Sequence, residues 1–452
     1  MKKCLIVLLC IFCTITLWAT DYNFADKYLQ KEVKKNHIPG MAVIVVDKDN
    51  VLFEKTYGKC KSKDTPFILG SLSKSFTACG IMKLAEEGSL KLDNSISRYI
   101  DLSRHFKNTE DASSITVRQL LNQTSGLTTH QRSGHLTKTD KHGKHVYSNM
   151  NYGLLGEIIE NVSGQSYSDF MKKNVFEVLG LNHSAANLKD SKSNGLIDGY
   201  RNYFGIPVKI NVKYPKEHAD KVWIPASAAY ISSSISDMGK YLQMYLNKGK
   251  NFLSEQTVNT MLYEGVDVNA KKHYSYGMGW RYSKEMFSKP VLYHTGSVEN
   301  YIARMFIFPD EGIAVAVLVN VYDHFVLTQF LTDIVKPLLG EERTLTENIY
   351  PVLHTAIDLI CLFIFSISGY ALITFRKQKS RLKLLILYLF IPTVLAFMPK
   401  IFGIPAWVAY LYVNDLFWTV YLNSAILFML GSITLIRLVS LNRKHIKYQH
   451  ER

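Results

Sequence analysis

The first group of residues that could do chemistry together is Ser71–Lys74, which directly precedes a predicted helix over residues 73–87. A serine at a helix start lies near the positive end of the helix dipole. A lysine three residues later lies on the same face, one turn into the helix. If burial removes its proton, Lys74 can accept the proton of Ser71 and make that hydroxyl a nucleophile. The same spacing recurs at Ser380–Lys383, and an ordinary helix cap also explains Ser71 alone.

A second group, Tyr147-Ser148-Asn149, precedes a predicted helix over residues 152–162. A phenol beside a cationic lysine can have its pKa depressed enough to act as a base, and an amide side chain can hold a substrate carbonyl. Taken alone, the pattern equally fits a loop tyrosine that packs on the following helix.

The third group, His294-Thr295-Gly296-Ser297, follows a predicted strand over residues 291–293. Glycine lets a substrate backbone approach the strand edge. The next backbone amide, that of Ser297, can pair with the amide of Ser71 to stabilise an oxyanion. Taken alone, this group is a turn at a strand end.

The elements that must position these groups divide into two sets. Strands are predicted early, over residues 41–46 and 51–57, and late, over 275–282, 291–293, 301–308 and 313–319. Helices are predicted over 21–36, 73–87, 119–121, 152–162, 167–179 and 238–246. Joining both strand groups into one antiparallel sheet gives an α+β fold with helices packed on it. The helical middle forms a second lobe, and a cleft between the lobes is the expected site.

The three groups together, in this order and on helix start, loop and strand end, resemble the serine β-lactamase and penicillin-binding-protein superfamily. Tyr-x-Asn in second place is similar to the class C branch, which also holds D-aminopeptidases and esterases. Residues 36–40, 120–127 and 149–156 are typical of the same branch. The resemblance covers roughly residues 25–340 and implies a β-lactamase/transpeptidase-like fold.

The resemblance also implies a role for each site residue. Ser71 would be the acylated nucleophile and Lys74 its activating partner. Tyr147 would carry the proton to the leaving group and from the deacylating water. Asn149 would bind the substrate amide, and the amides of Ser71 and Ser297 would form the oxyanion hole.

The third motif would line the substrate through His294, Thr295 and Gly296. His294 departs from the lysine that is usual in true β-lactamases, and histidine is familiar at this place in peptidase and esterase relatives. The departure lowers the expectation of efficient β-lactam hydrolysis. It also weakens a fixed positive charge for a substrate carboxylate at neutral pH.

The two ends of the chain predict its location. Residues 1–20 combine a basic start, an apolar stretch and a small residue before the polar chain, as in a secretory signal peptide; an uncleaved anchor is the alternative. Three apolar spans, Leu359–Phe375, Leu384–Met398 and Leu416–Ile436, are predicted within residues 351–440, before a basic tail over 441–452. Basic clusters at 376–383 and 443–447 predict cytoplasmic sides, which puts the hydrolase domain, residues 21–345, outside the cell membrane.

The net charge of +15 reflects this topology. Residues 351–452 hold 11 Lys and Arg and 3 acids, so +8 of the total lies in the anchor. With no basic helix or aromatic-interleaved stripe in the rest, we predict no nucleic-acid partner. Outside the signal and the spans only Cys60 and Cys79 remain, enough for one bridge but not a disulfide framework. No metal-ligand spacing occurs, and we predict no metal and no cofactor.

The sequence thus predicts a multi-pass, membrane-anchored serine hydrolase that acts through an acyl-enzyme on peptide or amide substrates, with D-residue-containing ones among the candidates. Two alternatives stay open. One is an esterase or weak β-lactamase that uses the same residues. The other is a non-catalytic receptor that binds penicillins or cell-wall fragments, against which the intact Ser71, Lys74 and Tyr147 count.

Overall fold

The structure is a computed structural model of the chain. It describes residues 22–341 apart from 129–130, 132–133, 204, 212–224, 288 and 324–326, then scattered residues between 355 and 397, and a helix over 414–450. The predicted signal peptide therefore lies outside the described residues. The chain forms two compact units, residues 1–201, 207–322 and 329–344 in one, and 202–206, 323–328 and 345–452 in the other.

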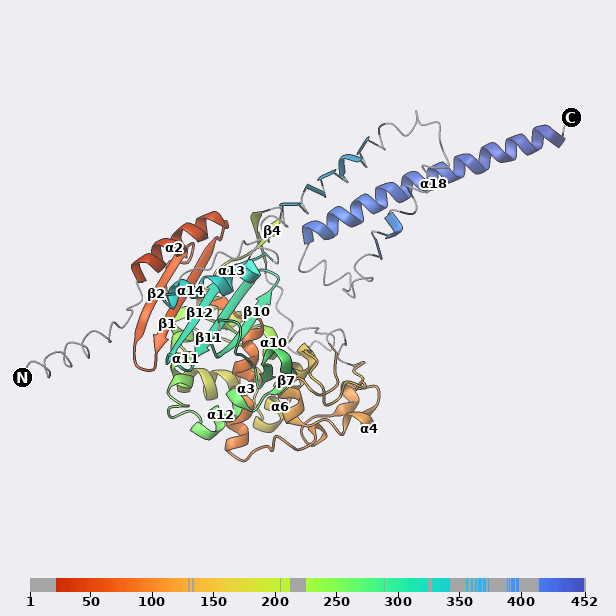
Figure 1. Ribbon diagram of the computed structural model, residues 1–452. Helices are drawn as coiled ribbons and strands as arrows, with labels where there is room; N and C mark the ends of the chain where they lie inside the picture. The colour runs from red at the N-terminus through yellow and green to blue at the C-terminus, as the bar shows by residue number, and fades with distance from the viewer. Residues whose placement is uncertain are drawn as a thin grey trace, which may run out of the picture. The chain divides into compact units, whose positions relative to one another are not determined.

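An antiparallel sheet of eight strands organises the first unit, in the order β2-β1-β12-β11-β10-β9-β8-β7 (Figure 1). Its strands are β1 (Gly40–Asp47), β2 (Val51–Gly58), β7 (Val266–Asn269), β8 (Tyr274–Gly277), β9 (Trp280–Ser283), β10 (Val291–Val298), β11 (Tyr301–Phe308) and β12 (Ile313–Val319). The first hairpin joins the late strands through β1 and β12, with Met41 opposite Val319 and Asp47 opposite Ile313. The predicted union of early and late strands in one antiparallel sheet is confirmed.

The remaining described strands are short. They are β3 (Phe67–Ile68), which pairs with β6 (Ser232–Ser233), and β4 (Gly199–Tyr203), β5 (Ile206–Ile210) and β13 (Val321–Tyr322), which form a second small sheet.

Described helices of four or more residues comprise α2 (Tyr22–Lys35), α3 (Ser73–Glu86), α4 (Thr109–Ala112), α5 (Val117–Leu121), α6 (Asn149–Ser163), α7 (Tyr167–Met171), η4 (Lys172–Phe176), α9 (Leu188–Ser193), α10 (Ala226–Ala229), α11 (Ile235–Leu246), α12 (Glu255–Tyr263), α13 (Leu327–Asp333), α14 (Val335–Leu338) and α18 (Asn414–His450). Helices cover both faces of the large sheet (Figure 1). On one face, α11 lies so close that a Cβ on Gly239 would be 2.5 Å from Ile44 Cδ1. On the other face, the ring of Tyr22 in α2 stacks on Phe53 of β2.

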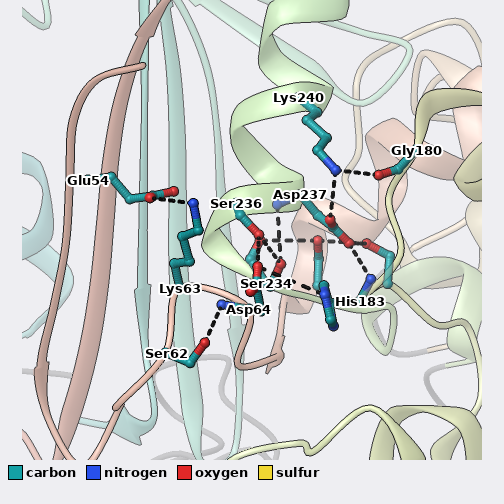
Figure 2. Close-up of polar contacts among 12 residues, drawn as sticks. Glu54, Ser62, Lys63, Asp64, Gly180, His183, Ser234, Ser236, Asp237 and Lys240 are labelled. Atoms are coloured by element: carbon teal, nitrogen blue, oxygen red, sulfur yellow. Dashed lines mark hydrogen bonds and ion pairs between the residues drawn. The ribbon is translucent and has the colours of Figure 1, made fainter. Parts of the chain in front are cut away.

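The buried carboxylate of Asp237 binds the start of α11 to residues 183–184 of the same chain (Figure 2). Asp237, in the first turn of α11, accepts hydrogen bonds from the backbone N–H of His183 at 2.7 Å and from Ser184 Oγ at 2.9 Å. Its own N–H donates to Ser234 Oγ, which caps the helix. Burial raises the pKa of Asp237, while these hydrogen bonds act to lower it. This network holds the start of α11, the helix that packs on β1 and β12.

Two strand predictions are corrected by the structure. The predicted strand over 275–282 is a hairpin, because Met278 and Gly279 have positive φ of 48° and 83° and reverse the chain between β8 and β9. The predicted strand over 291–293 continues as β10 to Val298, because Thr295 and Ser297 keep their pairing with β11. The glycine in the third motif therefore lies inside a strand, not at its end.

Cysteine pairing is settled for the first unit. Cys60 and Cys79 are buried free thiols, and Cys79 contacts the hydroxyl of Tyr245 at 3.1 Å. The bridge that the two cysteines could have formed does not exist in this structure.

The C-terminal unit bears on the predicted anchor. Helix α18 contains Phe417–Ile436, the one stretch among the described residues long and apolar enough to cross a membrane. The helix continues through residue 450, so the predicted third span and the basic cluster at 443–447 lie in one element. The first two predicted spans fall mostly outside the described residues. The predicted multi-pass arrangement is therefore not supported by the part of the chain that the structure describes.

Candidate active site

Ser71 lies in the 3₁₀ turn η1 (Gly70–Leu72), and Lys74 lies in the first turn of helix α3. The helix begins at Ser73, as predicted, directly after the 3₁₀ turn. Lys74 Nζ donates to Asn149 Oδ1 and to the carbonyl oxygen of Ala228, both at 2.8 Å. It lies 3.1 Å from Ser71 Oγ. A neutral amine has two N–H donors and one lone pair, and the two carbonyl oxygens can only accept. In the neutral amine the lone pair would therefore be left for the hydroxyl proton of Ser71.

Electrostatics favour this neutral amine. The side chain of Lys74 is 0% exposed. Burial, with a smaller contribution from the nearby guanidinium of Arg281, lowers the pKa of Lys74 well below its usual value. No described carboxylate forms an ion pair with Lys74 within 4.0 Å.

Tyr147 lies beside the amine, with Lys74 Nζ 4.9 Å from the centre of its ring. Burial raises the pKa of the Tyr147 phenol, while Arg281 and a hydrogen bond to Ser71 act in the opposite direction. The sequence-based expectation of a depressed phenol pKa is therefore wrong. The difference arises because burial of the phenol outweighs the charge of Arg281 and the hydrogen bond to Ser71. At neutral pH the phenol therefore keeps its proton.

The segment from Asn122 to Leu127 holds the Tyr147 loop in place. Gln123, with a φ of 60°, accepts the N–H of Ser148 on Oε1 at 2.9 Å and the N–H of Val146 on its backbone oxygen at 2.8 Å. It also accepts from Asn151 Nδ2, and Ser125 Oγ donates to Asn151 Oδ1 at 2.6 Å. These contacts explain why residues 120–127 accompany the second motif. Helix α6 starts at Asn149, so the Asn149 amide is fixed by the first helical turn.

The third motif meets η1 backbone to backbone. A Cβ on Gly70 would lie 2.3 Å from the backbone nitrogen of Ser297, and a Cβ on Gly296 would lie 2.0 Å from the carbonyl oxygen of Leu69. Only glycine at both positions allows this approach. It brings the Gly70–Ser71 segment against the Gly296–Ser297 segment, as an oxyanion hole built from the Ser71 and Ser297 amides requires.

His294 is 0% exposed and its ring is neutral. Burial, and after it the charge of Arg281, lower the pKa of His294 well below its usual value. The ring Nδ1 is 2.8 Å from the carbonyl oxygen of Thr295, which can only accept, so the proton sits on Nδ1. Nε2 is then an acceptor, and it has no hydrogen-bond partner among the described residues.

Arg281 of β9 is the site residue that sequence reasoning missed. Its guanidinium carbon lies 5.5 Å from the ring centre of Tyr147, 5.6 Å from that of Tyr276 and 5.9 Å from that of Tyr274. No ion pair within 4.0 Å involves it among the described residues. The sequence around Arg281 carries no motif that would predict its place in the site, because its neighbours come from β8, β10 and the Tyr147 loop.

The structure thus brings all eight predicted site residues to one place, where η1 and α3 meet β10 and the start of α6. Ser71 and Lys74 come from the first element pair, Tyr147 and Asn149 from the helical lobe, and residues 294–297 from the sheet. The arrangement places the Ser71 hydroxyl and the Tyr147 ring beside the Lys74 amine, and the Tyr147 ring beside His294.

This fold and this site define a family. The β-lactamase family model matches residues 25–326, and the chain belongs to that family. The resemblance stated from the motifs is confirmed.

Several known proteins are similar to the chain. Protein flp of Staphylococcus aureus strain N315 is 28% identical over 383 residues, covering 75% of this chain and 73% of that protein. A class C β-lactamase in complex with cefoxitin has a TM-score of 0.59 and 21% identity, covering 71% of this chain and 98% of that one. A D-stereospecific amidohydrolase from Streptomyces sp. has a TM-score of 0.54 and 19% identity, covering 66% and 94%.

Replacing Gly70 by alanine is expected to lower turnover by about 100-fold, the cost typical of a small misplacement of reacting groups. Any Cβ there must push η1 away from Ser297. Gly88→Ala is the matched control, because Gly88 also has a positive φ, of 77°, but a Cβ on it meets nothing within 4 Å. Turnover and thermal unfolding of both variants should be compared. Equal activity in the two would contradict the close approach of η1 and β10.

Proposed function

We propose that the protein is a membrane-anchored, extracytoplasmic serine hydrolase that cleaves peptide or amide substrates through an acyl-enzyme on Ser71. The observation that carries this proposal is the bonding of Lys74. Two carbonyl acceptors occupy its N–H groups and leave its lone pair beside Ser71 Oγ. A neutral buried amine in this position is a general base for a serine nucleophile.

Acylation would proceed with Lys74 as the base. Ser71 Oγ forms a bond to the substrate carbonyl carbon, its proton passes to Lys74 Nζ, and the carbonyl π pair moves onto oxygen. The amides of Ser71 and Ser297 stabilise that oxyanion. When the tetrahedral intermediate collapses, the bond to the leaving nitrogen breaks and the phenol of Tyr147 donates a proton to it. The proton on Lys74 then restores the phenol.

Deacylation would use the same groups in reverse. A water molecule loses its proton to the Tyr147–Lys74 pair and its oxygen forms a bond to the acyl carbon. The bond to Ser71 Oγ breaks, and the proton returns to that oxygen. Asn149 Oδ1 is engaged by Lys74, which orients its amide nitrogen to donate to a substrate carbonyl.

Arg281 supports a substrate that carries a carboxylate near the scissile bond. Sequence reasoning expected His294 in place of lysine to leave the site short of positive charge, and His294 is indeed neutral here. Arg281 supplies a permanent charge instead, held by tyrosine rings and not by an acid. A free peptide carboxylate matches it, and the likeness in fold to a D-stereospecific amidohydrolase leaves D-residues among the candidates.

The substrate class can be tested with Arg281→Gln. We expect kcat/KM for a peptide with a free terminal carboxylate to fall about 10- to 100-fold, the cost of a lost charged hydrogen bond. The same peptide as its C-terminal amide, and a neutral short-chain ester, should change little, because both lack the anionic group. Arg281→Lys, which keeps the charge, should retain part of the preference. Kinetics on wild type and both variants, with D- and L-peptides, provide the measurement.

The outcome of that comparison distinguishes the proposed peptidase from an esterase, from a receptor and from an indirect role of Arg281. An equal loss on all three substrates would mean that Arg281 acts through Tyr147 and Lys74 and not on the substrate. A wild-type preference for esters over every peptide would make the protein an esterase. Binding without turnover of any substrate would favour a receptor.

The membrane part of the proposal rests on α18 and on charge. The apolar stretch Phe417–Ile436 is followed in the same helix by the basic cluster at 443–447. Basic residues next to an apolar span favour the cytoplasmic side. Protease protection of an epitope placed after residue 452, in sealed right-side-out vesicles, tests this orientation.

A further inference from the structure

We propose that Arg304 is a positioning residue for the oxyanion hole, which it serves by holding and polarising the peptide group between Gly296 and Ser297. This inference rests on the proposed hydrolase function and adds to it a residue of β11, the strand that pairs with the third motif.

The contact is a hydrogen bond through the sheet. Arg304 lies on β11 directly opposite Thr295 of β10. Its Nη1 donates to the carbonyl oxygen of Gly296 at 3.3 Å and to that of Ala303 at 2.9 Å. The side chain is 4% exposed, so water competes little for these bonds.

The carbonyl of Gly296 and the N–H of Ser297 belong to one peptide group. In a trans peptide these two bonds point in opposite directions. A cation that donates to the carbonyl oxygen therefore lies at one end of the peptide dipole. The N–H of Ser297 lies at the other end, and its nitrogen is close to Gly70 of η1. A donor on the oxygen withdraws electron density and strengthens the N–H as a donor, because hydrogen bonds in a chain polarise one another.

The guanidinium is suited to this role because it stays charged. Burial lowers the pKa of Arg304 to about 10, which leaves it a cation at neutral pH. A fixed positive charge on the carbonyl oxygen of Gly296 also favours a negative charge that develops near the N–H of Ser297. The contact restrains the peptide in the same place where Gly296 and Gly70 already allow the closest approach of the two backbones.

Arg201 of β4 is a matched control. It is 7% exposed, and its Nε donates at 3.1 Å to the backbone oxygen of Glu299, in the turn between β10 and β11. Replacing Arg201 by methionine removes a buried arginine and one hydrogen bond to a carbonyl oxygen of the same hairpin. It leaves the hydrogen bond to the peptide group between Gly296 and Ser297 in place. Loss of general hairpin stability would affect both variants.

The test compares Arg304→Met, Arg304→Lys and Arg201→Met in the full-length protein in detergent. A boronic acid forms a tetrahedral anionic adduct with a serine nucleophile and so probes the oxyanion hole. We expect the dissociation constant of phenylboronic acid to rise about 10-fold in Arg304→Met, less than the 10²- to 10³-fold loss caused by removing an oxyanion donor. KM for a neutral ester should change little, kcat should fall with the boronate affinity, and Arg304→Lys should recover part of both.

A second readout follows the peptide itself and does not need catalysis. Labelling glycine carbonyls with ¹³C and serine nitrogens with ¹⁵N selects the Gly-Ser peptides of the sequence, Gly70–Ser71, Gly88–Ser89, Gly296–Ser297 and Gly431–Ser432. The Gly296–Ser297 amide signal should shift in Arg304→Met, with Gly88–Ser89 and Gly431–Ser432 unchanged as internal references.

Two results would overturn the inference. One is boronate affinity in Arg304→Met within about 2-fold of wild type, which is far below the cost of a perturbed oxyanion hole. The other is an equal loss of affinity in Arg201→Met, which would reduce Arg304 to a structural residue. Wild-type protein that binds no boronate would overturn the proposed function itself. That failure is recognised without any variant, while the labelled peptide still reports the contact.

Discussion

Ser71→Ala is expected to abolish hydrolysis, with a loss of at least about 10⁴-fold, as removal of a serine nucleophile causes in other hydrolases. The loss should be this large because the covalent route through an acyl-enzyme disappears, and the amine of Lys74 then has no hydroxyl to activate. Labelling by a fluorophosphonate probe should disappear at the same time. Turnover of the best peptide or ester substrate and gel fluorescence of the labelled protein provide the measurements.

Ser73→Ala is the control for this variant. Ser73 lies two residues further along and is buried, and its Oγ accepts the N–H of Ile231 at 3.0 Å. Losing that acceptor costs about 1–3 kcal/mol of the free energy of unfolding. Fluorophosphonate labelling should nevertheless persist. Labelling that survives Ser71→Ala but is lost in Ser73→Ala would reassign the nucleophile.

Lys74→Met should lower the acylation rate by about 10²- to 10⁴-fold, the usual contribution of a positioned general base. The reason is that Lys74 Nζ lies 3.1 Å from Ser71 Oγ, while the phenol of Tyr147 has a raised pKa and keeps its proton at neutral pH. Single-turnover kinetics of acylation would measure the effect free of later steps.

Lys74→Arg separates charge from basicity. An arginine keeps a positive charge at the position but cannot act as a base at neutral pH. We expect it to be as inactive as Lys74→Met. The pH profile follows from the direction of the pKa shift. Because the pKa of Lys74 is lowered, the neutral base is present above that lowered value, and acylation should fall only as the pH drops through it. Activity that rises only near the ordinary lysine pKa would contradict a neutral amine.

The sheet and most helices could be predicted because each element shows its own pattern. The strands over 301–308 and 313–319 match β11 and β12, and the amphipathic helix over 21–36 is α2 with one residue fewer at each end. Local periodicity decides such elements. The hairpin at Met278–Gly279 was missed because Met278 shows no turn signal, although its φ is positive.

In the candidate site, too, some residues could be predicted from local sequence features and others could not. Its motif residues could be predicted because the spacing in Ser71–Lys74 and the glycine in the third motif are local features of the chain. Arg281 and Arg304 could not, because their importance comes from neighbours brought together by sheet pairing, Tyr293 opposite Arg281 and Thr295 opposite Arg304. The expected pKa shift of Tyr147 was wrong for a related reason. The direction of that shift depends on burial, which the spacing of residues does not reveal.

The central claim is that substrate is carried as an acyl group on Ser71, and the mass of the protein during turnover tests it most directly. Full-length protein should be quenched in acid while it turns over its best substrate, and its mass measured before and after proteolytic mapping. We predict an increase equal to the acyl fragment, located on the peptide that contains Ser71–Lys74 and absent from Ser71→Ala. Turnover with no adduct on wild-type protein, or an adduct on another residue, would contradict the account.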